Sequence, residues 1–206
     1  MTGPYLSKYQ VFRSMKLVSF DILRLLKGKK EMFEIKKCLL DQLSNSLLED
    51  FCHNQQINQK WVRIDNYWVL EEVEETRSWG VEKKAWIPVY LKEQVERGGF
   101  VFGAFFEGTL IGFISLDGYL RGSAEKYANL TMLFIDDRFN RRGLGTCLFE
   151  RICEEAKEIG ATKLFISAIP SVETIAFYKK LGCVKAQENI PEYIDTQEDY
   201  CLEFLL

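Results

Sequence analysis

Apolar residues recur along this 206-residue chain with two spacings, which predict an alternation of strands and helices. Short apolar runs predict strands at residues 32–37, 100–106, 109–115, 127–135 and 163–168, with two more near 184 and at 200–205. Apolar residues three or four apart predict helices at residues 17–26, 40–52, 83–97, 144–160 and 172–181. Two aromatic-rich runs around Asp65-Asn66 predict a hairpin over residues 60–70. This order indicates an α/β (α+β) fold, with a mixed central sheet of about seven strands and helices on both faces.

The first 30 residues differ from the rest in charge, and we expect them to form a basic N-terminal extension. Residues 1–30 contain seven Lys and Arg and one acid, a balance of +6. The rest contains 20 Lys and Arg and 29 acids, a balance of −9, and the two add up to the net charge of −3. We expect residues 31–206 to form the compact domain. An acidic body is a poor general binder of nucleic acid, so no nucleic-acid partner is expected.

Several function classes are disfavoured by the composition. No apolar run reaches the roughly 18 residues of a membrane span, so no membrane partner is expected. Asp21 and Arg24 interrupt the apolar stretch at residues 15–26, which argues against a signal peptide. Six cysteines without a CxxC spacing favour reduced thiols in the cytoplasm and no metal site. His53 is the only histidine and has no nucleophile motif beside it, which favours a surface position over a catalytic role.

The most informative stretch is Leu133-Phe-Ile-Asp-Asp-Arg-Phe-Asn-Arg-Arg-Gly-Leu-Gly-Thr146. It predicts a strand, a short turn with arginines and glycines, and a helix that starts directly after the turn. Free backbone N–H groups at a helix N-terminus bind anions, and glycines let a phosphate approach the backbone. A Walker A loop is excluded because no lysine stands between Gly145 and Thr146. A Rossmann fingerprint is disfavoured because the third glycine is missing and the turn lies late in the chain.

A second motif follows the glycine turn, and the order and spacing of the two motifs are informative together. It reads Ser171-Val-Glu-Thr-Ile-Ala-Phe-Tyr-Lys-Lys-Leu-Gly-Cys183. With this motif, the chain resembles the GNAT superfamily of acyl-CoA-dependent N-acetyltransferases over about residues 32–206. The resemblance implies the GNAT fold and a bacterial-type small-molecule or protein acetyltransferase that uses acetyl-CoA. Three positions depart from the family pattern: Asn140 replaces Arg or Gln, Ser171 replaces Asn, and Cys183 replaces Phe.

The resemblance also implies a set of cofactor-binding residues. Main-chain groups near Leu133 and Ile135 would bind the pantetheine arm and polarise the thioester, and N–H groups of the turn would hold the pyrophosphate. The implied residues are Leu133, Phe134, Ile135, Arg141, Arg142, Gly143, Leu144, Gly145, Thr146, Ser171 and Tyr178. Arg141 and Arg142 would supply the charge that Asn140 does not.

The expected reaction is the direct attack of a primary amine on acetyl-CoA within a ternary complex. Tyr178 stands where the family places the acid that protonates the departing thiolate, and a phenol pKa near 10 suits a thiol pKa near 8.5. The strand at 127–133 has no acid, so Asp117, at the end of the preceding strand, is the first candidate for the base. An ordinary turn aspartate, with water as the base, is the alternative reading.

The acceptor and the assembly state are less determined by the sequence. Trp61, Tyr67, Trp68 and Trp79 with Asp65 and the acids at 71–75 suit a cationic amine, although a hydrophobic lid and a solvated acidic run explain them equally well. We expect a small-molecule acceptor. A non-catalytic acyl-CoA sensor and an acetyltransferase of protein N-termini or lysines are the alternatives. The last strand, at 200–206, could pair with a second subunit to form a homodimer.

Overall fold

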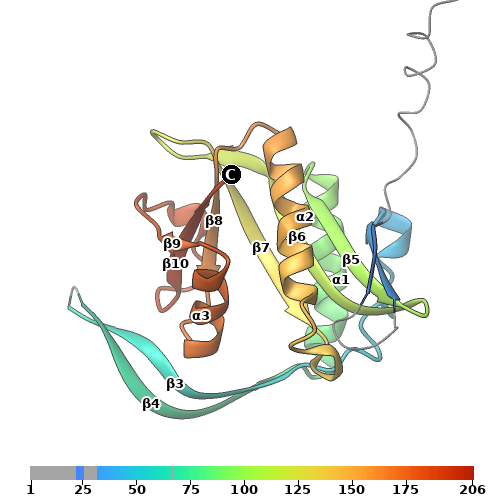
Figure 1. Ribbon diagram of the computed structural model, residues 1–206, viewed down its shortest axis with the longest axis horizontal. Coiled ribbons are helices and arrows are strands. Elements are labelled where there is room, and N and C mark those ends of the chain that lie inside the picture. Colours follow the sequence, from blue (N-terminus) through green and yellow to red (C-terminus); the bar gives the residue numbers. More distant parts are fainter. Residues whose placement is uncertain (1–21, 26–31, 66) are drawn as a thin grey trace, which may run out of the picture.

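The computed structural model describes residues 22–25, 32–65 and 67–206. Its strands are β1 (Ile22–Leu25), β2 (Met32–Lys37), β3 (Asn54–Ile64), β4 (Tyr67–Ser78), β5 (Phe100–Phe106), β6 (Thr109–Arg121), β7 (Tyr127–Ile135), β8 (Lys163–Ala168), β9 (Val184–Lys185) and β10 (Tyr200–Leu205). Its α-helices are α1 (Val81–Glu96), α2 (Leu144–Glu158) and α3 (Val172–Lys180). Figure 1 shows how they are arranged.

Eight of these strands form one mixed sheet in the order β1-β2-β5-β6-β7-β8-β10-β9. Every neighbouring pair in it is antiparallel except β7 and β8, which are parallel and are joined through α2. The fold class predicted from the sequence is therefore confirmed, with the short β1 and β9 at the two edges of the sheet.

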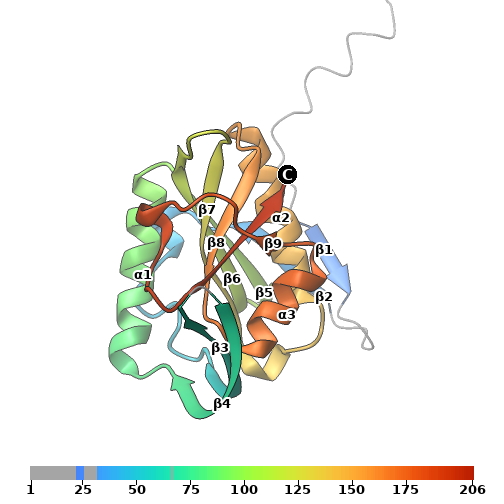
Figure 2. The ribbon, with the colours of Figure 1, turned by 90° about the vertical axis from the view of Figure 1, so that its left-hand side faces the viewer.

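The two faces of the sheet carry separate hydrophobic cores. Helices α2 and α3 cover one face, where Leu148, Ile152 and Ile175 are buried against the strands. Helix α1 covers the other face through Ile87 and Leu91. Figure 2 shows α1 on one side of the sheet and α2 and α3 on the other. Both cores are needed because each strand of the central sheet presents apolar side chains to both sides.

The central irregularity of the sheet is a bulge at Thr131. On β6, Ser115 and Leu116 are consecutive, but they pair with Met132 and Leu130 of β7, so Thr131 is an extra residue. The pairing of β7 with β8 ends at the same place, with Leu130 opposite Ile166. Burial changes there too, because residues 127–130 are buried and residues 131–135 are only half-buried. The bulge therefore marks the point where β7 and β8 separate.

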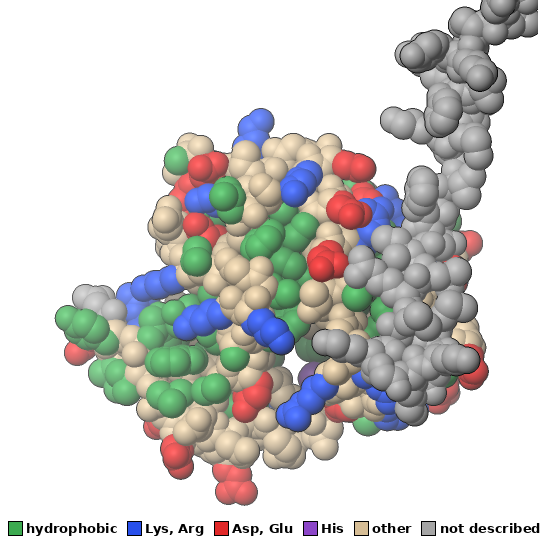
Figure 3. Space-filling model, viewed as in Figure 1, with side chains coloured by type: hydrophobic (Ala, Val, Ile, Leu, Met, Phe, Trp, Pro, Cys, Tyr) green, Lys and Arg blue, Asp and Glu red, His purple; other side chains and the backbone are tan. Residues whose placement is uncertain are grey.

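Strands β3 and β4 form a separate two-stranded sheet that extends away from the body like an arm (Figure 1). The hairpin predicted over residues 60–70 is confirmed, and it is longer than expected, because it also takes in the acidic residues 71–75. One side of the arm packs on the body, where the ring of Trp68 lies 4.6 Å from that of Tyr200. Hydrophobic side chains are visible on the arm in Figure 3, and Ile64 and Tyr67 are exposed.

The predicted helix over residues 40–52 is wrong. The segment contains a single 3-10 turn at Leu40–Gln42 followed by further turns. The N–H groups of Leu47 and Phe51 bond to carbonyls three residues back, so no α-helical ladder forms. Polar side chains at residues 44–46 favour turns because they compete with the helical backbone, and the hydroxyls of Ser44 and Ser46 lie 3.0 Å apart. The apolar periodicity reflected burial in the core under α1 and not a helix.

The predicted helix over residues 17–26 is also wrong where it can be compared. Ile22–Leu25 forms β1, which pairs antiparallel with β2, and residues 17–21 and 26 lie outside the described residues. Pairing with an open sheet edge overrides local helix propensity. The proposed boundary between an extension at 1–30 and a domain at 31–206 stays a prediction, with β1 on the extension's side of it.

The remaining predicted elements are confirmed, with small shifts in their bounds. Strand β10 lies between β8 and β9, so a second subunit could pair only where β9, two residues long, leaves β10 uncovered. Dimerisation therefore stays a prediction. All six cysteines lie in the described part of the chain and none forms a disulfide. No helix in the described ranges is long and apolar enough to cross a membrane.

A second bulge in β6 lies between Leu116, which pairs with Leu130, and Leu120, which pairs with Ala128, and the end of α1 packs closely against it. A Cβ atom at Gly118 would lie 2.4 Å from the carbonyl carbon of Gly98, just after α1. We predict that Gly118→Ala lowers the free energy of unfolding by about 2–3 kcal/mol, a drop in Tm of about 5–10 °C, because backbone must move to admit the methyl group. Thermal unfolding followed by circular dichroism measures this.

The matched control is Gly80→Ala at the start of α1. A Cβ atom there would meet nothing within 4 Å, and only its helix-capping preference changes, so a loss of less than about 1 kcal/mol is expected. Equal losses in the two variants would show that the contact between Gly118 and Gly98 is not tight.

Candidate functional site

A cleft of about 1410 Å³ opens where β7 and β8 separate. One end is lined by the turn at residues 139–147 and by α3. The other end is lined by α1 and residues 195–199, and the start of β3 reaches the first end, where Gln55 donates a hydrogen bond to Thr174 of α3 (3.3 Å). In Figure 3 the surface is hollowed beside the arm, with Lys and Arg side chains around the hollow. The cleft therefore runs from one face of the sheet to the other.

The open edge of β7 forms the middle of the cleft. Leu133, Phe134 and Ile135 all line it, and their strand is paired only with β6 at this level. Backbone N–H and C=O groups on the β8 side of the strand have no strand partner there. A ligand with amide groups can therefore bind along β7 as an added strand would.

The turn after β7 is anchored by a buried aspartate. Asp136 is fully buried, and its carboxylate accepts hydrogen bonds from the side chain of Arg138 (2.6 and 2.9 Å) and from the N–H of Cys52 (3.0 Å). Burial alone would raise the pKa of Asp136, but these hydrogen bonds outweigh it and hold the pKa below its usual value. The turn is thus fixed to the loop that precedes β3.

The N-terminus of α2 is uncapped and opens onto the cleft. Its N-cap is Gly143, no side chain in the described part of the chain caps it, and its first turn has no acid. A Cβ atom at Gly143 would meet nothing within 4 Å, so open space lies over the first N–H groups. Arg141 adopts a left-handed backbone (φ 61°), which is unfavourable for a residue other than glycine and typical of functional turns.

The other predicted residues of the turn have clear positions. Arg142, Leu144 and Thr146 line the cleft together with Gly143. Helix α3 approaches the backbone closely at Gly145, because a Cβ atom there would lie 3.1 Å from the ring of Phe177. The turn and α3 therefore face each other across the same end of the cleft.

Tyr178 lies in α3 and lines the cleft, although its side chain is only 6% exposed. Its ring packs against those of Phe149 and Phe177. Burial in this apolar surrounding raises the pKa of the phenol, so the hydroxyl keeps its proton at neutral pH. A group in this state can donate a proton into the cleft.

Two predicted site residues do not line the cleft. Ser171 is fully buried and caps α3, since its Oγ accepts a hydrogen bond from the N–H of Thr174 (3.1 Å). Asp117 lies in the second bulge of β6, where its carboxylate accepts the N–H of Tyr119 (3.1 Å). Their proposed roles stay predictions, and the geometry places neither side chain against a ligand in the cleft.

The aromatic residues that line the second end of the cleft were not those expected, although Trp79, one of the four expected, packs on the cleft residues His53 and Phe134. Trp86 and Tyr90 of α1 line it, with their rings 5.1 Å apart, whereas Trp61 and Trp68 pack on the body and Tyr67 is exposed on the arm. Nothing in the sequence distinguished the two aromatic residues of α1 from ordinary core residues of a helix.

Acids at this end come from the loop before β10. Asp195 and Asp199 both line the cleft and meet at Ser167, the last cleft-lining polar residue of β8. Ser167 donates a hydrogen bond to Asp199 (2.7 Å) and accepts one from the N–H of Asp195 (3.2 Å). Burial and the neighbouring Asp199 raise the pKa of Asp195. These acids and aromatic rings suit a cationic ligand.

His53 is a further cleft residue that the sequence did not single out. The prediction of a surface position is wrong, because the imidazole is half-buried and lines the cleft beside Phe134. No local signal in the sequence could have found it, because the segments that surround His53 come together only in the tertiary fold.

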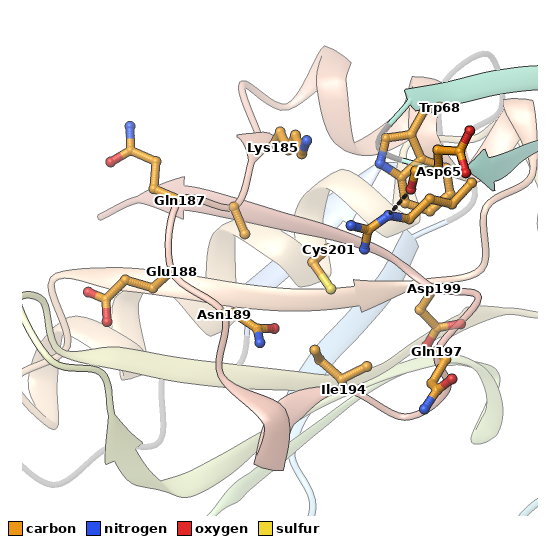
Figure 4. Close-up of a pocket in the computed structure, with 12 residues that line it drawn as sticks. Asp65, Trp68, Lys185, Gln187, Glu188, Asn189, Ile194, Gln197, Asp199 and Cys201 are labelled. Carbon is orange, nitrogen blue, oxygen red and sulfur yellow. Dashed lines mark hydrogen bonds between the residues drawn. The ribbon is translucent and has the colours of Figure 1, made fainter.

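A second cavity, of about 770 Å³, lies between the arm and the β9–β10 edge (Figure 4). Asp65 and Trp68 lie at its arm end, where the side chain of Arg63 bonds to the carbonyl of Asp65 (3.2 Å), and Lys185 and Glu188 lie across from them. Acidic, basic and amide side chains all line this cavity. Within the described ranges, no cluster of three or more His, Cys, Asp and Glu residues is arranged to hold a metal ion.

Comparison with known families and proteins agrees with this geometry. Residues 59–183 match the model of the acetyltransferase (GNAT) family. An uncharacterised N-acetyltransferase of Methanocaldococcus jannaschii is 33% identical over 107 residues, which cover 49% of this chain and 46% of that protein. The match thus spans about half the length of that curated relative.

Solved structures share the fold at low sequence identity. Nourseothricin acetyltransferase superposes with a TM-score of 0.63 at 14% identity, covering 84% of this chain and 98% of that one. A putative streptothricin acetyltransferase from Bacillus anthracis, solved in complex with acetyl coenzyme A, gives 0.59 at 16% identity with the same coverage. The ribosomal-protein-S18-alanine N-acetyltransferase of Escherichia coli gives 0.53 at 18% identity, covering 84% and 94%.

Proposed function

Because the chain belongs to the acetyltransferase (GNAT) family, we propose that it transfers an acetyl group from acetyl-CoA to a primary amine of a small molecule. The reaction is a direct attack within a ternary complex. The observation that carries the proposal is a single cleft that joins the open edge of β7, the uncapped N-terminus of α2 and the buried Tyr178. The bound acetyl-CoA in the Bacillus anthracis structure supports the same cofactor here.

The cofactor occupies the end of the cleft between the turn and α3. Its pyrophosphate lies over Gly143 and accepts hydrogen bonds from the backbone N–H groups of residues 141–146. The helix N-terminus has no side-chain cap there, and the space over Gly143 is open. Its pantetheine amides form hydrogen bonds with the main chain of residues 133–135. The pantetheine arm thus takes the place of the strand partner that β7 lacks beyond Leu130. The thioester then lies near the point where β7 and β8 separate.

The chemistry requires three things at the thioester. The attacking amine must be neutral, the developing oxyanion needs fixed donors, and the departing thiolate needs a proton. The N–H of Ile135 serves as the oxyanion donor, and the hydroxyl of Tyr178 protonates the thiolate. Its raised pKa keeps the hydroxyl protonated until the thiolate, in the same dry surrounding, takes the proton.

The acceptor enters from the other face, between α1 and the loop before β10. A protonated amine is attracted by Asp195 and Asp199 and can pack on the rings of Trp86 and Tyr90. Asp117 lies outside the cleft, so a base role for it requires groups in between.

Acetyl-CoA incubated with a panel of small primary amines, polyamines, amino acids and peptides tests the proposal. We expect CoA release together with an acetylated small amine, seen by mass spectrometry. Tight acetyl-CoA binding with no turnover on any amine would indicate a sensor. Acetylation of peptides alone would indicate a protein acetyltransferase.

Gly143→Ala tests the pyrophosphate position. We predict that the new methyl group enters the anion space and weakens CoA binding at least about tenfold, equivalent to 1.4 kcal/mol. Isothermal titration calorimetry with CoA measures it.

Gly160→Ala is the matched control for this variant. Gly160 follows α2, has nearly the same φ (86° against 87°) and also has open space around a Cβ atom. Both substitutions therefore cost similar backbone strain, but only the one at Gly143 lies in the cleft. Equal CoA affinity in the two variants would contradict the proposed pyrophosphate position.

Tyr178→Phe tests the proton donor. We predict a fall in kcat of about 10²–10⁴ with little change in acetyl-CoA affinity, since only the hydroxyl is removed. Steady-state kinetics on the best amine from the panel measures it. Tyr200→Phe, in the same core but outside the cleft, is the control and should keep normal turnover. Near-normal kcat in Tyr178→Phe would refute the role.

A further inference from the structure

His53 is held in the cleft by the backbone on both of its sides. The N–H of Cys52 donates to Asp136 (3.0 Å), and the N–H of Asn54 donates to Asp137 (2.5 Å). The carbonyl of His53 accepts the N–H of Trp79 (3.2 Å). Two consecutive aspartates after β7 thus fix this residue relative to the proposed cofactor turn.

The imidazole lies beside the strand that holds the thioester in the proposed function. Its ring lies 4.5 Å from that of Trp79 and 5.2 Å from that of Phe134, which stands between Leu133 and Ile135. Phe134 faces the α1 side of the sheet, the side from which the acceptor enters.

We propose that His53 is the base that deprotonates the acceptor amine, directly or through one water molecule. This inference rests on the proposed function and identifies the group that accepts the proton of the acceptor amine. Four described acids line the cleft. Asp137 is engaged by Asn54 and Asn140, and Asp199 by Ser167 and Thr196, while Glu173 lies in the first turn of α3, which lines the proposed cofactor end. Asp195, on the loop before β10, is the remaining strong competitor.

The protons balance in this scheme. A neutral imidazole nitrogen takes one proton from the acceptor ammonium, which frees the nitrogen lone pair to attack the thioester carbonyl. As the C–N bond forms and the C–S bond breaks, Tyr178 gives its proton to the CoA thiolate. The second proton leaving the amine restores the Tyr178 hydroxyl, and the imidazolium releases its proton to solvent.

The surroundings leave the imidazole neutral near pH 7. Burial lowers the pKa of His53, and the nearby charge of Asp137 opposes this shift only in part. Arg77 at the end of β4 and Lys83 of α1 line the same cleft, as do Asp195 and Asp199. A neutral ring has one nitrogen able to accept a proton, as a base requires.

His53→Gln and His53→Phe test the role by kinetics. We expect kcat/KM for the best amine to fall about 10²-fold at pH 7 in both, with acetyl-CoA affinity within about threefold of wild type. The loss should shrink as the pH rises toward the amine pKa near 10.4, because more amine is then already neutral. A loss that stays constant with pH, or normal turnover, would overturn the proposal.

Three comparisons make the outcome specific. Glu49→Gln, an exposed change on the same loop, should keep wild-type kinetics. If Asp195→Asn shows the pH-dependent loss and the His53 variants do not, the base is Asp195 and the proposal fails. If the wild-type protein acetylates no amine, the proposed function itself is wrong. That failure is seen without any variant and is therefore distinguishable from a failure of the His53 proposal.

Nuclear magnetic resonance tests the same residue without a variant. Because His53 is the only histidine, the imidazole signals of ¹⁵N-labelled protein without a histidine tag need no assignment. We expect a ring that is neutral at pH 7 and whose signals shift when acetyl-CoA is added. A ring that is protonated at pH 7, or unaffected by saturating acetyl-CoA, would overturn the proposal.

Discussion

The extra residue at Thr131 is the constraint on which the site depends. A strand pair that continued in register beyond Leu130 and Ile166 would close the sheet and satisfy every backbone group. The bulge instead bends β7 away, and residues 131–135 keep only the partner on β6. Unpaired backbone groups in a half-buried place are costly unless a ligand or water satisfies them. The fold therefore holds an unpaired strand edge in its centre, between two hydrophobic cores.

The same separation brings the two halves of the reaction together. The proposed cofactor end is lined by α2 and α3 on one face of the sheet, and the proposed acceptor end by α1 and the loop before β10 on the other. Asp136 and Asp137 link them, because both belong to the turn that leads to α2 and both bond to the loop around His53. A shift of the turn would move the acceptor end with it.

The sequence predicted the part of the molecule whose signals are local. A strand, a glycine turn and an amphipathic helix follow one another at residues 127–158, and each needs only its own residues to be recognised. The segment at 40–52 failed because burial of Leu43, Leu48 and Phe51 gives a helical spacing even in successive turns. The acceptor end could not be predicted, because Trp86, Asp195 and His53 come from three separate segments that only the tertiary fold brings together. At Ser171 the motif pointed to a cofactor-binding residue, but in the structure its side chain caps helix α3.

Desolvation connects the two groups to which we assign proton transfers. Burial disfavours the charged form of any side chain, so it raises the pKa of Tyr178 and lowers that of His53. The shifts have opposite directions but the same result, since both groups are neutral near pH 7. A neutral phenol is the form that can give a proton, and a neutral imidazole is the form that can take one. Desolvation is the largest cause of both shifts, and at His53 it outweighs the charge of Asp137. A more open cleft would move both pKa values back toward their ordinary values, which ties the two shifts to the packing of Phe134, Phe149 and Phe177 around these groups.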